Sequence, residues 1–109
     1  CKYVEKFDGM GVRFVRSCLY FLVLLPEGVS KGSALENMCK ADSLASLVKG
    51  RKVISAGDYE NDIEMLKASD ISFCPANSQP EVKRASDYVL NSSCDEDAIA
   101  EALEALLKL

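Results

Sequence analysis

Hydrophobic residues from position 30 onward alternate between the spacing of strands and the spacing of helices. Residues 53–56, 71–73 and 88–90 are short apolar runs of the kind that form buried strands. Segments with helical spacing lie around these runs, and helices are predicted to begin at Ser30, near Ser43, near Asp62, at about Gln79 and after Ser93. This alternation predicts an α/β fold in which parallel strands are covered by helices on both faces.

Several helix starts carry further detail. The first helix has apolar residues one turn apart, which predict its buried face: Ala34, Leu35, Met38 and Cys39. Residues 78–81 and 93–96 both have the spacing of a capping box, and Pro80 suits a first helical position. The acidic residues 95–97 are interpreted as charges in the first turn of the last helix, where the helix dipole favours them.

The segment before position 30 is rich in Val, Phe, Tyr and Leu between residues 11 and 25, and residues 26–28 (PEG) stop it. This pattern predicts one or two strands followed by a turn. Residues 18–25 form the longest apolar run of the chain, which is far shorter than the ~20 residues that a membrane-spanning helix needs. We predict a buried strand there and no contact with a membrane.

Composition narrows the class of protein. The chain has 109 residues, 49% of them hydrophobic and 28% charged with both signs mixed, which favours one folded unit with a solvated surface. A net charge of −4 argues against a nucleic-acid partner, because phosphate backbones select clustered Lys and Arg. Five cysteines without a CxxC pair, and no histidine, predict reduced and mostly buried thiols in a cytoplasmic protein rather than a zinc site or disulfides.

An acidic loop, residues 57–66 (GDYENDIEML), follows the strand predicted at 53–56. Ligands of open α/β sheets collect at this carboxyl end, and Mg²⁺ takes one or two carboxylates there, which Asp58 and Asp62 could supply. Such a loop on its own is more often a solvated turn. A calcium loop is excluded, because Ile63 and Ser69 stand where that motif requires Gly and Glu.

A second candidate is the small-residue loop 28–32 (GVSKG), which carries Lys31 into a helix N-terminus. Free backbone N–H groups and the helix dipole favour an anion at such a position, and Lys31 would add a positive charge. The alternative is an ordinary solvent-facing lysine in a capped helix start.

Taken together and in this order, residues 28–35, residues 57–66, and residues 76–78 with 81–83 resemble the Cof-type (subclass IIB) phosphatases of the haloacid dehalogenase superfamily. The resemblance covers about residues 28–107. It implies that residues 27–109 are the C-terminal part of that family's Rossmann-like core domain. Residues 1–26 look like the last strands of its α/β cap domain.

The resemblance also implies roles for individual residues. Asp58 would bind Mg²⁺ directly, and Asp62 would support the metal site through water. Lys31 would contact the phosphate and the attacking aspartate, and Asn61 would bind phosphate. Asn77 is expected to hold a loop rather than act on the substrate. The expected activity is Mg²⁺-dependent hydrolysis of small phosphorylated metabolites such as sugar phosphates through an aspartyl-phosphate.

The chain departs from the family pattern in two places. The DxDx[TV] motif that carries the family's nucleophile is not found among the 109 residues, and residues 95–97 (DED) match it only superficially. Ala76 and Ser78 stand where the family has Gly and Ala. We therefore expect the chain alone to be inactive and its function to belong to a longer phosphatase. The alternative is a non-catalytic truncated module, or a half that assembles with another chain.

A structural consequence follows from the missing nucleophile segment. In the family, the strand predicted at 53–56 pairs with the strand that carries the nucleophile. Without that partner its edge is bare, and bare strand edges invite pairing with other chains. We therefore predict that the isolated chain self-associates through this edge.

Overall fold

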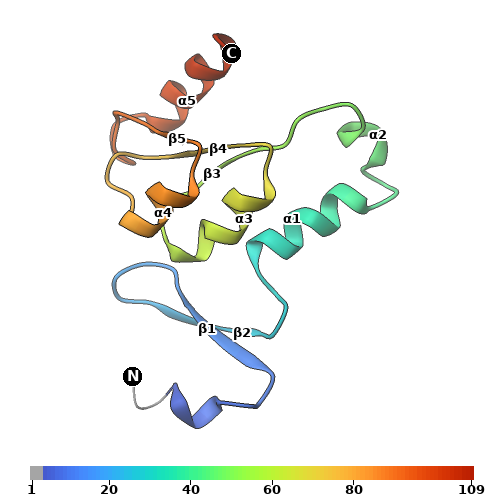
Figure 1. The fold of residues 1–109 in the computed structure, drawn as a ribbon, viewed down its shortest axis with the longest axis vertical. Coiled ribbons are helices and arrows are strands. Elements are labelled where there is room, and N and C mark those ends of the chain that lie inside the picture. The colour runs from blue at the N-terminus through green and yellow to red at the C-terminus, as the bar shows by residue number, and fades with distance from the viewer. Residues whose placement is uncertain (1–3) are drawn as a thin grey trace.

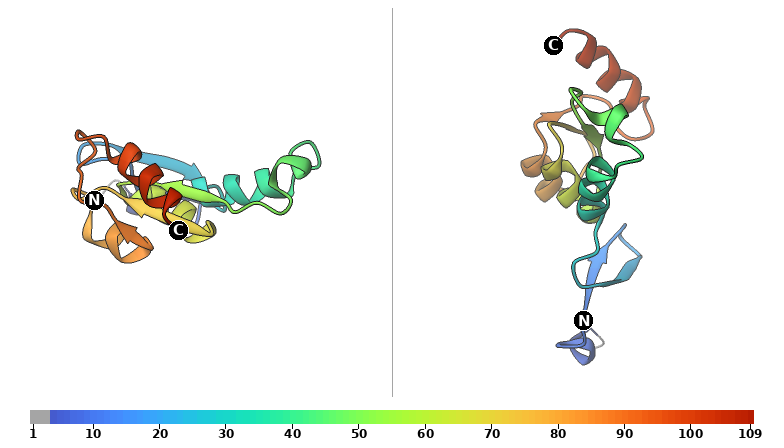
Figure 2. Two further views of the ribbon diagram at one scale, coloured as in Figure 1. Left: turned by 90° about the horizontal axis from the view of Figure 1, so that it is seen from above. Right: turned by 90° about the vertical axis from the view of Figure 1, so that its right-hand side faces the viewer.

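The computed structural model describes residues 4–109, in which an N-terminal hairpin stands below an α/β unit (Figure 1). The hairpin follows a short 3-10 helix, η1 (Glu5–Phe7), and consists of the antiparallel strands β1 (Val12–Arg16) and β2 (Leu22–Pro26). It projects from the α/β unit when the molecule is seen from the side (Figure 2). The radius of gyration of 15.7 Å accordingly exceeds the value of about 13 Å for a compact chain of this length.

The α/β unit is built on three parallel strands, β3 (Ile54–Ala56), β4 (Ile71–Cys74) and β5 (Tyr88–Val89), in that spatial order. The helices are α1 (Lys31–Lys40), α2 (Ala45–Val48), α3 (Ile63–Ala68), α4 (Pro80–Ala85) and α5 (Ala98–Leu107), with a 3-10 turn η2 (Glu60–Asp62) before α3. No helix within residues 4–109 is long and apolar enough to span a membrane. The predicted α/β fold with parallel strands is confirmed.

Helices cover both faces of the sheet. Adjacent residues of β4 point to opposite sides, so each face presents a buried side chain to the helices on that side. Phe73 packs with Leu90 and two alanines of α5 on one face, whereas Cys74 packs with Leu66 of α3 and Val82 of α4 on the other. Figure 1 shows α5 on one side of the sheet and α3 with α4 on the other. Burial of a side chain such as Phe73, which is 1% exposed, stabilises the fold by about 1.5–3 kcal/mol.

The strand β3 lies at one edge of the sheet and pairs only with β4 among the described residues. Ile54 on this edge is 44% exposed. The bare edge expected from the sequence is therefore present in residues 4–109. Self-association through it stays a prediction.

The hairpin corrects one prediction. Residues 18–25 were expected to form a buried strand, but Leu19, Tyr20 and Phe21 precede β2 and are 66%, 85% and 67% exposed. Within β2, exposed and half-buried residues alternate. A two-stranded hairpin can turn only one face toward the rest of the described chain, so apolar composition alone does not bury the other face.

The predicted buried face of α1 is also partly wrong. Leu35 and Cys39 are half-buried, but Ala34 and Met38 are exposed. The buried residue of α1 is Gly32, at the point where the helix crosses α3. The face of α1 is set by this crossing at its N-terminus rather than by its apolar spacing.

Neither predicted capping box is formed. Gln79 is the N-cap of α4, and its backbone N–H donates to the carbonyl of Asp58 at 3.3 Å, while the buried hydroxyl of Ser78 has no partner among the described residues. The Glu96 carboxylate accepts the Ser93 N–H at 2.9 Å, but this closes a turn ahead of α5. The acidic residues 95–97 therefore precede α5 instead of forming its first turn, and Asp97 has a left-handed backbone (φ 61°) that separates the turn from the helix.

The thiols are less buried than predicted. Of the four cysteines described, only Cys74 is buried, Cys18 and Cys39 are half-buried and Cys94 is exposed. Cys1 lies outside the described residues. All four described thiols are free, as expected.

Candidate functional site

Two residues that are 31 positions apart in the chain meet at the carboxyl end of β3. The Nζ atom of Lys31, in the first turn of α1, lies 2.5 Å from Oδ1 of Asp62 at the end of η2. The side chain of Asp62 is 8% exposed, whereas that of Lys31 is 51% exposed. A buried carboxylate is thus paired with a lysine whose side chain is half exposed and can also meet an anion.

The second oxygen of Asp62 organises the acidic loop. Oδ2 accepts hydrogen bonds from the backbone N–H of Asp58 at 3.0 Å and of Tyr59 at 3.4 Å. Both carboxylate oxygens are therefore occupied by protein donors, which replace the hydrogen bonds to water that burial removes. Asp62 fixes the Asp58 loop and the Lys31 ammonium in one arrangement.

Two glycines make this arrangement possible by leaving space. A Cβ atom on Gly57 would lie 2.4 Å from Cβ of Asp62, and one on Gly32 would lie 2.7 Å from the backbone carbonyl carbon and oxygen of Glu64. Neither glycine has a positive φ, so the requirement is for space rather than for an unusual backbone. Gly57 lets the Asp62 carboxylate reach the loop, and Gly32 lets the start of α1 approach α3.

The start of α1 is fixed by its cap. The Ser30 hydroxyl accepts the Ser33 N–H and the Ser33 hydroxyl accepts the Ser30 N–H, both at 2.9 Å. The helix start predicted at Ser30 is confirmed. Lys31 follows directly as the first residue of the helix, so its backbone position depends on this cap.

The structure brings Lys31 and Asn61 to a common cavity of about 290 Å³ between α1, η2 and the hairpin. Its remaining wall includes Val15, Val23 and Leu25 of the hairpin. The predicted phosphate-binding residues therefore face one open space, beside an apolar surface.

Asp58 lines a different cavity of about 420 Å³, together with Gly57, Pro75, Cys94 and Asp95. Asp58 is exposed, and its carboxylate has no hydrogen-bond partner among the described residues. The backbone of Asp58 is linked to Lys31 through Asp62, because Oδ1 of Asp62 accepts from Lys31 and Oδ2 accepts from the N–H groups of Asp58 and Tyr59.

The sequence profile of the haloacid dehalogenase-like hydrolases matches residues 1–103. The chain belongs to this family. A phosphoglycolate phosphatase of Sulfurisphaera tokodaii is 35% identical over 106 residues, which cover 96% of this chain and 44% of that protein. The chain spans 31–44% of the length of five curated phosphatases that it matches.

Solved structures agree with this assignment. SMU.1108c from Streptococcus mutans superposes with a TM-score of 0.81 at 25% identity, over 99% of this chain and 40% of that protein. The haloacid dehalogenase subclass IIB sugar phosphatase BT4131 superposes with a TM-score of 0.75 at 25% identity, over 96% of this chain and 39% of that protein. The resemblance to the Cof-type members of the family is confirmed, as is the Rossmann-like fold.

The donors available in this haloacid dehalogenase-like chain fit a magnesium ion that takes few protein ligands. Residues 4–109 contain no group of three or more His, Cys, Asp or Glu side chains that could hold a metal. Mg²⁺ commonly binds through one or two carboxylates plus phosphate and water, and the Asp58 carboxylate, which has no partner within residues 4–109, meets that requirement. Because both Asp62 oxygens are occupied, a role for Asp62 through water is easier to accommodate than direct coordination.

Asn77 holds a loop, as predicted. Its Oδ1 accepts the Cys94 N–H at 2.9 Å, and its Nδ2 donates to the Cys94 sulfur at 3.1 Å. These bonds tie the loop after β4 to the loop after β5. Asn77 therefore shapes the cavity that Asp58 lines.

Sequence reasoning missed a contact between the hairpin and α3. The Arg13 guanidinium bonds Glu64, and a hydrogen bond with the Ser30 side chain and one with Arg13 hold the pKa of the Glu64 carboxyl below its ordinary value of 4.5. Arg13 and Glu64 are 51 positions apart and belong to no shared motif. No local signal in the sequence could have paired them.

Proposed function

We propose that this chain is the C-terminal part of a Mg²⁺-dependent phosphatase that hydrolyses small phosphomonoesters in the cytoplasm, sugar phosphates among them. The attacking aspartate is supplied by a segment outside these 109 residues. It displaces the alcohol from phosphorus to form an aspartyl-phosphate, and water then releases inorganic phosphate.

One observation carries this proposal: an ammonium group and a loop with a free carboxylate are both fixed by Asp62 at the carboxyl end of a parallel strand. Lys31 contacts Oδ1 and the Asp58 loop contacts Oδ2 of the same buried carboxylate. Groups fixed in advance stabilise the charge that develops on a transferring phosphoryl group without reorganising during the reaction. The similarity to phosphoglycolate and sugar phosphatases points to the same chemistry.

Each residue then has a distinct task. Lys31, whose side chain is half exposed, donates to a phosphate oxygen, and Asn61 donates an amide N–H to the same phosphate in the cavity that both residues line. Asp58 supplies a carboxylate to the metal, and Asp62 holds Lys31 and the loop in place. When bound, Mg²⁺ supplies positive charge that offsets the charge of the phosphate.

The test is hydrolysis of p-nitrophenyl phosphate by the full-length protein, with Mg²⁺ and after chelation. We expect Mg²⁺-dependent turnover in the wild type and a kcat lower by about 10²–10³-fold in Lys31→Ala, the usual loss when one donor to a developing charge is removed. Lys40→Ala, at the other end of α1, is the matched control. Equal kcat values for Lys31→Ala and Lys40→Ala would refute the role of Lys31.

The alternative function is a non-catalytic module, or a half that assembles with another chain. The bare edge of β3 in residues 4–109 favours it, since that edge offers unpaired backbone groups to a partner strand. The same assay separates the two functions. A full-length protein that hydrolyses no phosphomonoester at any Mg²⁺ concentration would favour the module.

A further inference from the structure

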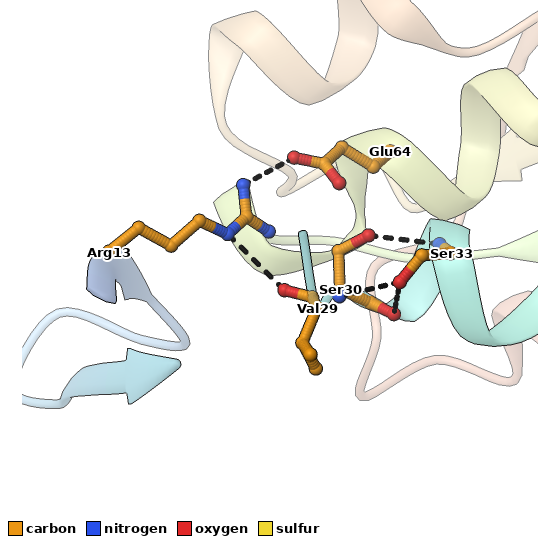
Figure 3. Close-up of polar contacts among 5 residues, drawn as sticks. All are labelled: Arg13, Val29, Ser30, Ser33 and Glu64. Atoms are coloured by element: carbon orange, nitrogen blue, oxygen red, sulfur yellow. Dashed lines mark hydrogen bonds and ion pairs between the residues drawn. The ribbon is translucent and has the colours of Figure 1, made fainter. Parts of the chain in front are cut away.

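Arg13 of β1 reaches from the hairpin to the start of the site (Figure 3). Its Nη1 atom lies 2.5 Å from Oε1 of Glu64 on α3, and its Nε donates to the carbonyl of Val29 at 3.3 Å. Val29 immediately precedes Ser30, the cap of α1. The Arg13 guanidinium therefore holds three segments together: the hairpin, the turn that connects the hairpin to α1, and α3.

These contacts are connected to Lys31 through Ser30, the N-cap of α1, because Lys31 is the next residue. Arg13, Ser30 and Glu64 line one cavity, and the Ser30 side chain, together with Arg13, holds the pKa of the Glu64 carboxyl below its ordinary value. The Ser30 hydroxyl accepts a hydrogen bond from the Ser33 N–H, and the backbone carbonyl of Ser30 accepts one from the Ala34 N–H at 3.0 Å. Ser30 is 8% exposed, so its position is set by these partners rather than by water.

The connection that Arg13 holds is a short turn. Val29 donates its N–H to the Pro26 carbonyl at 3.1 Å, and Gly28 between them has a left-handed backbone with φ of 81°. Glu27 donates its N–H to the Gly11 carbonyl at 2.8 Å, which fastens the beginning of the turn to the hairpin. The end of the turn, at Val29, is fastened by Arg13.

We infer that Arg13 is a positioning residue, which fixes the Val29–Ser30 peptide against α3 and thereby sets the reach of Lys31 toward Asp62 and the phosphate. Its action on catalysis rests on the proposed phosphatase function, whereas its action on the start of α1 does not. The placement of the hairpin is thus coupled to the placement of the phosphate-binding lysine. An exposed ion pair contributes little to overall stability, so the main effect is local.

The first test measures amide hydrogen exchange in this chain. The Ser33 and Ala34 amides both bond to Ser30, and we expect them to exchange about three- to tenfold faster in Arg13→Ala than in the wild type. Arg16→Ala is the matched control, because Arg16 is an exposed arginine of the same strand without a polar partner among the described residues. It should leave both amides unchanged.

The Leu90 amide, which donates to the Cys74 carbonyl in the sheet, reports whether a variant is folded. Unchanged exchange of Ser33 and Ala34 in an Arg13→Ala chain that keeps its protection at Leu90 would overturn the inference. If Arg13→Ala loses protection at Leu90, Glu64→Gln is tested instead, with exchange of the Ser33 and Ala34 amides as the readout and protection at Leu90 as the folding control. It keeps the size of the side chain and removes its charge.

The second test is kinetic and uses the full-length protein. Arg13→Ala should lower kcat about tenfold with little change in KM, and Arg13→Lys, which keeps the charge, should restore part of the loss. Because Arg13 acts through Lys31, adding Arg13→Ala to Lys31→Ala should lower kcat no further. If the losses in kcat of the two single variants multiply in the double variant, Arg13 does not act through Lys31. A wild type without phosphatase activity would refute the proposed function instead, and the exchange test would still decide the role of Arg13.

Discussion

Replacement of Gly57 by Ala should displace the Asp62 carboxylate and thereby disrupt the site. The added Cβ would lie 2.4 Å from Cβ, 2.7 Å from Cγ and 2.9 Å from Oδ2 of Asp62. These atoms belong to a buried side chain, and real Cβ atoms essentially never approach other atoms so closely. The Asp62 carboxylate must therefore move away from the loop that it holds.

The size of the effect follows from what Asp62 would give up. Forcing a methyl group into a packed site costs about 1–3 kcal/mol. A hydrogen bond to a charged group contributes about 1.5–3 kcal/mol, and the bond from the Asp58 N–H at 3.0 Å is the one nearest the clash. We expect Gly57→Ala to lower the free energy of unfolding by about 3–5 kcal/mol.

Urea unfolding of the chain measures this loss, with Gly50→Ala as the control. A Cβ on Gly50 would meet no atom within 4 Å, so only its left-handed backbone (φ 73°) opposes the change, at about 1–2 kcal/mol. Exchange of the Asp58 amide should rise in Gly57→Ala and stay unchanged in Gly50→Ala. If Gly57→Ala destabilises the chain no more than Gly50→Ala does, the contact with Asp62 does not restrict position 57.

Two further predictions concern α5 and the sheet edge. Hydrogen bonds from Ser92 and from the Asn91 backbone hold the pKa of Glu101 below its ordinary value of 4.5, so its stabilising effect is present above that pH and is lost as the pH falls through the lowered pKa. Glu101→Gln should therefore destabilise the chain to urea at neutral pH and converge with the wild type in acid; a constant difference at all pH values would contradict this. The isolated chain should self-associate in size-exclusion chromatography, and Ile54→Lys on the bare edge should increase the monomer fraction, unlike Leu107→Lys on α5. A wild-type chain that elutes as a monomer would rule this out.

The sequence predicts the helices and strands well because their signals are local. The apolar runs at β3, β4 and β5 and the helical spacing between them are set by residues a few positions apart. Neighbouring residues of a strand point to opposite faces, so Phe73 and Cys74 require cover on both sides of the sheet. The layered architecture follows from this local pattern.

Burial and capping were predicted less well, because they depend on distant partners. The serine at position 78 has the spacing of a cap, but Gln79 takes the N-cap position when its N–H bonds the Asp58 carbonyl, 21 positions earlier in the chain. Residues 19–21 are apolar yet exposed, since nothing else in residues 4–109 covers that end of the hairpin. Spacing and composition carry no information about such contacts.

The same distinction between local and distant signals applies to the candidate site. Lys31 and Asp62 could be named from short motifs, but their direct contact depends on the crossing of α1 and α3 at Gly32. The contact between Arg13 and Glu64 joins segments without any shared motif and could not be predicted. The residues of a site can thus be recognised locally, whereas the groups that position them emerge only from the fold.

The most direct test of the account is the Mg²⁺ affinity of the full-length protein, measured by calorimetry. Asp58 offers the free carboxylate of the loop that Asp62 fixes, so Asp58→Asn should weaken Mg²⁺ binding by at least about tenfold. Asp42→Asn, in the exposed turn between α1 and α2, should leave the affinity unchanged. An Asp58→Asn protein that binds Mg²⁺ as tightly as the wild type would contradict a magnesium site at the end of β3.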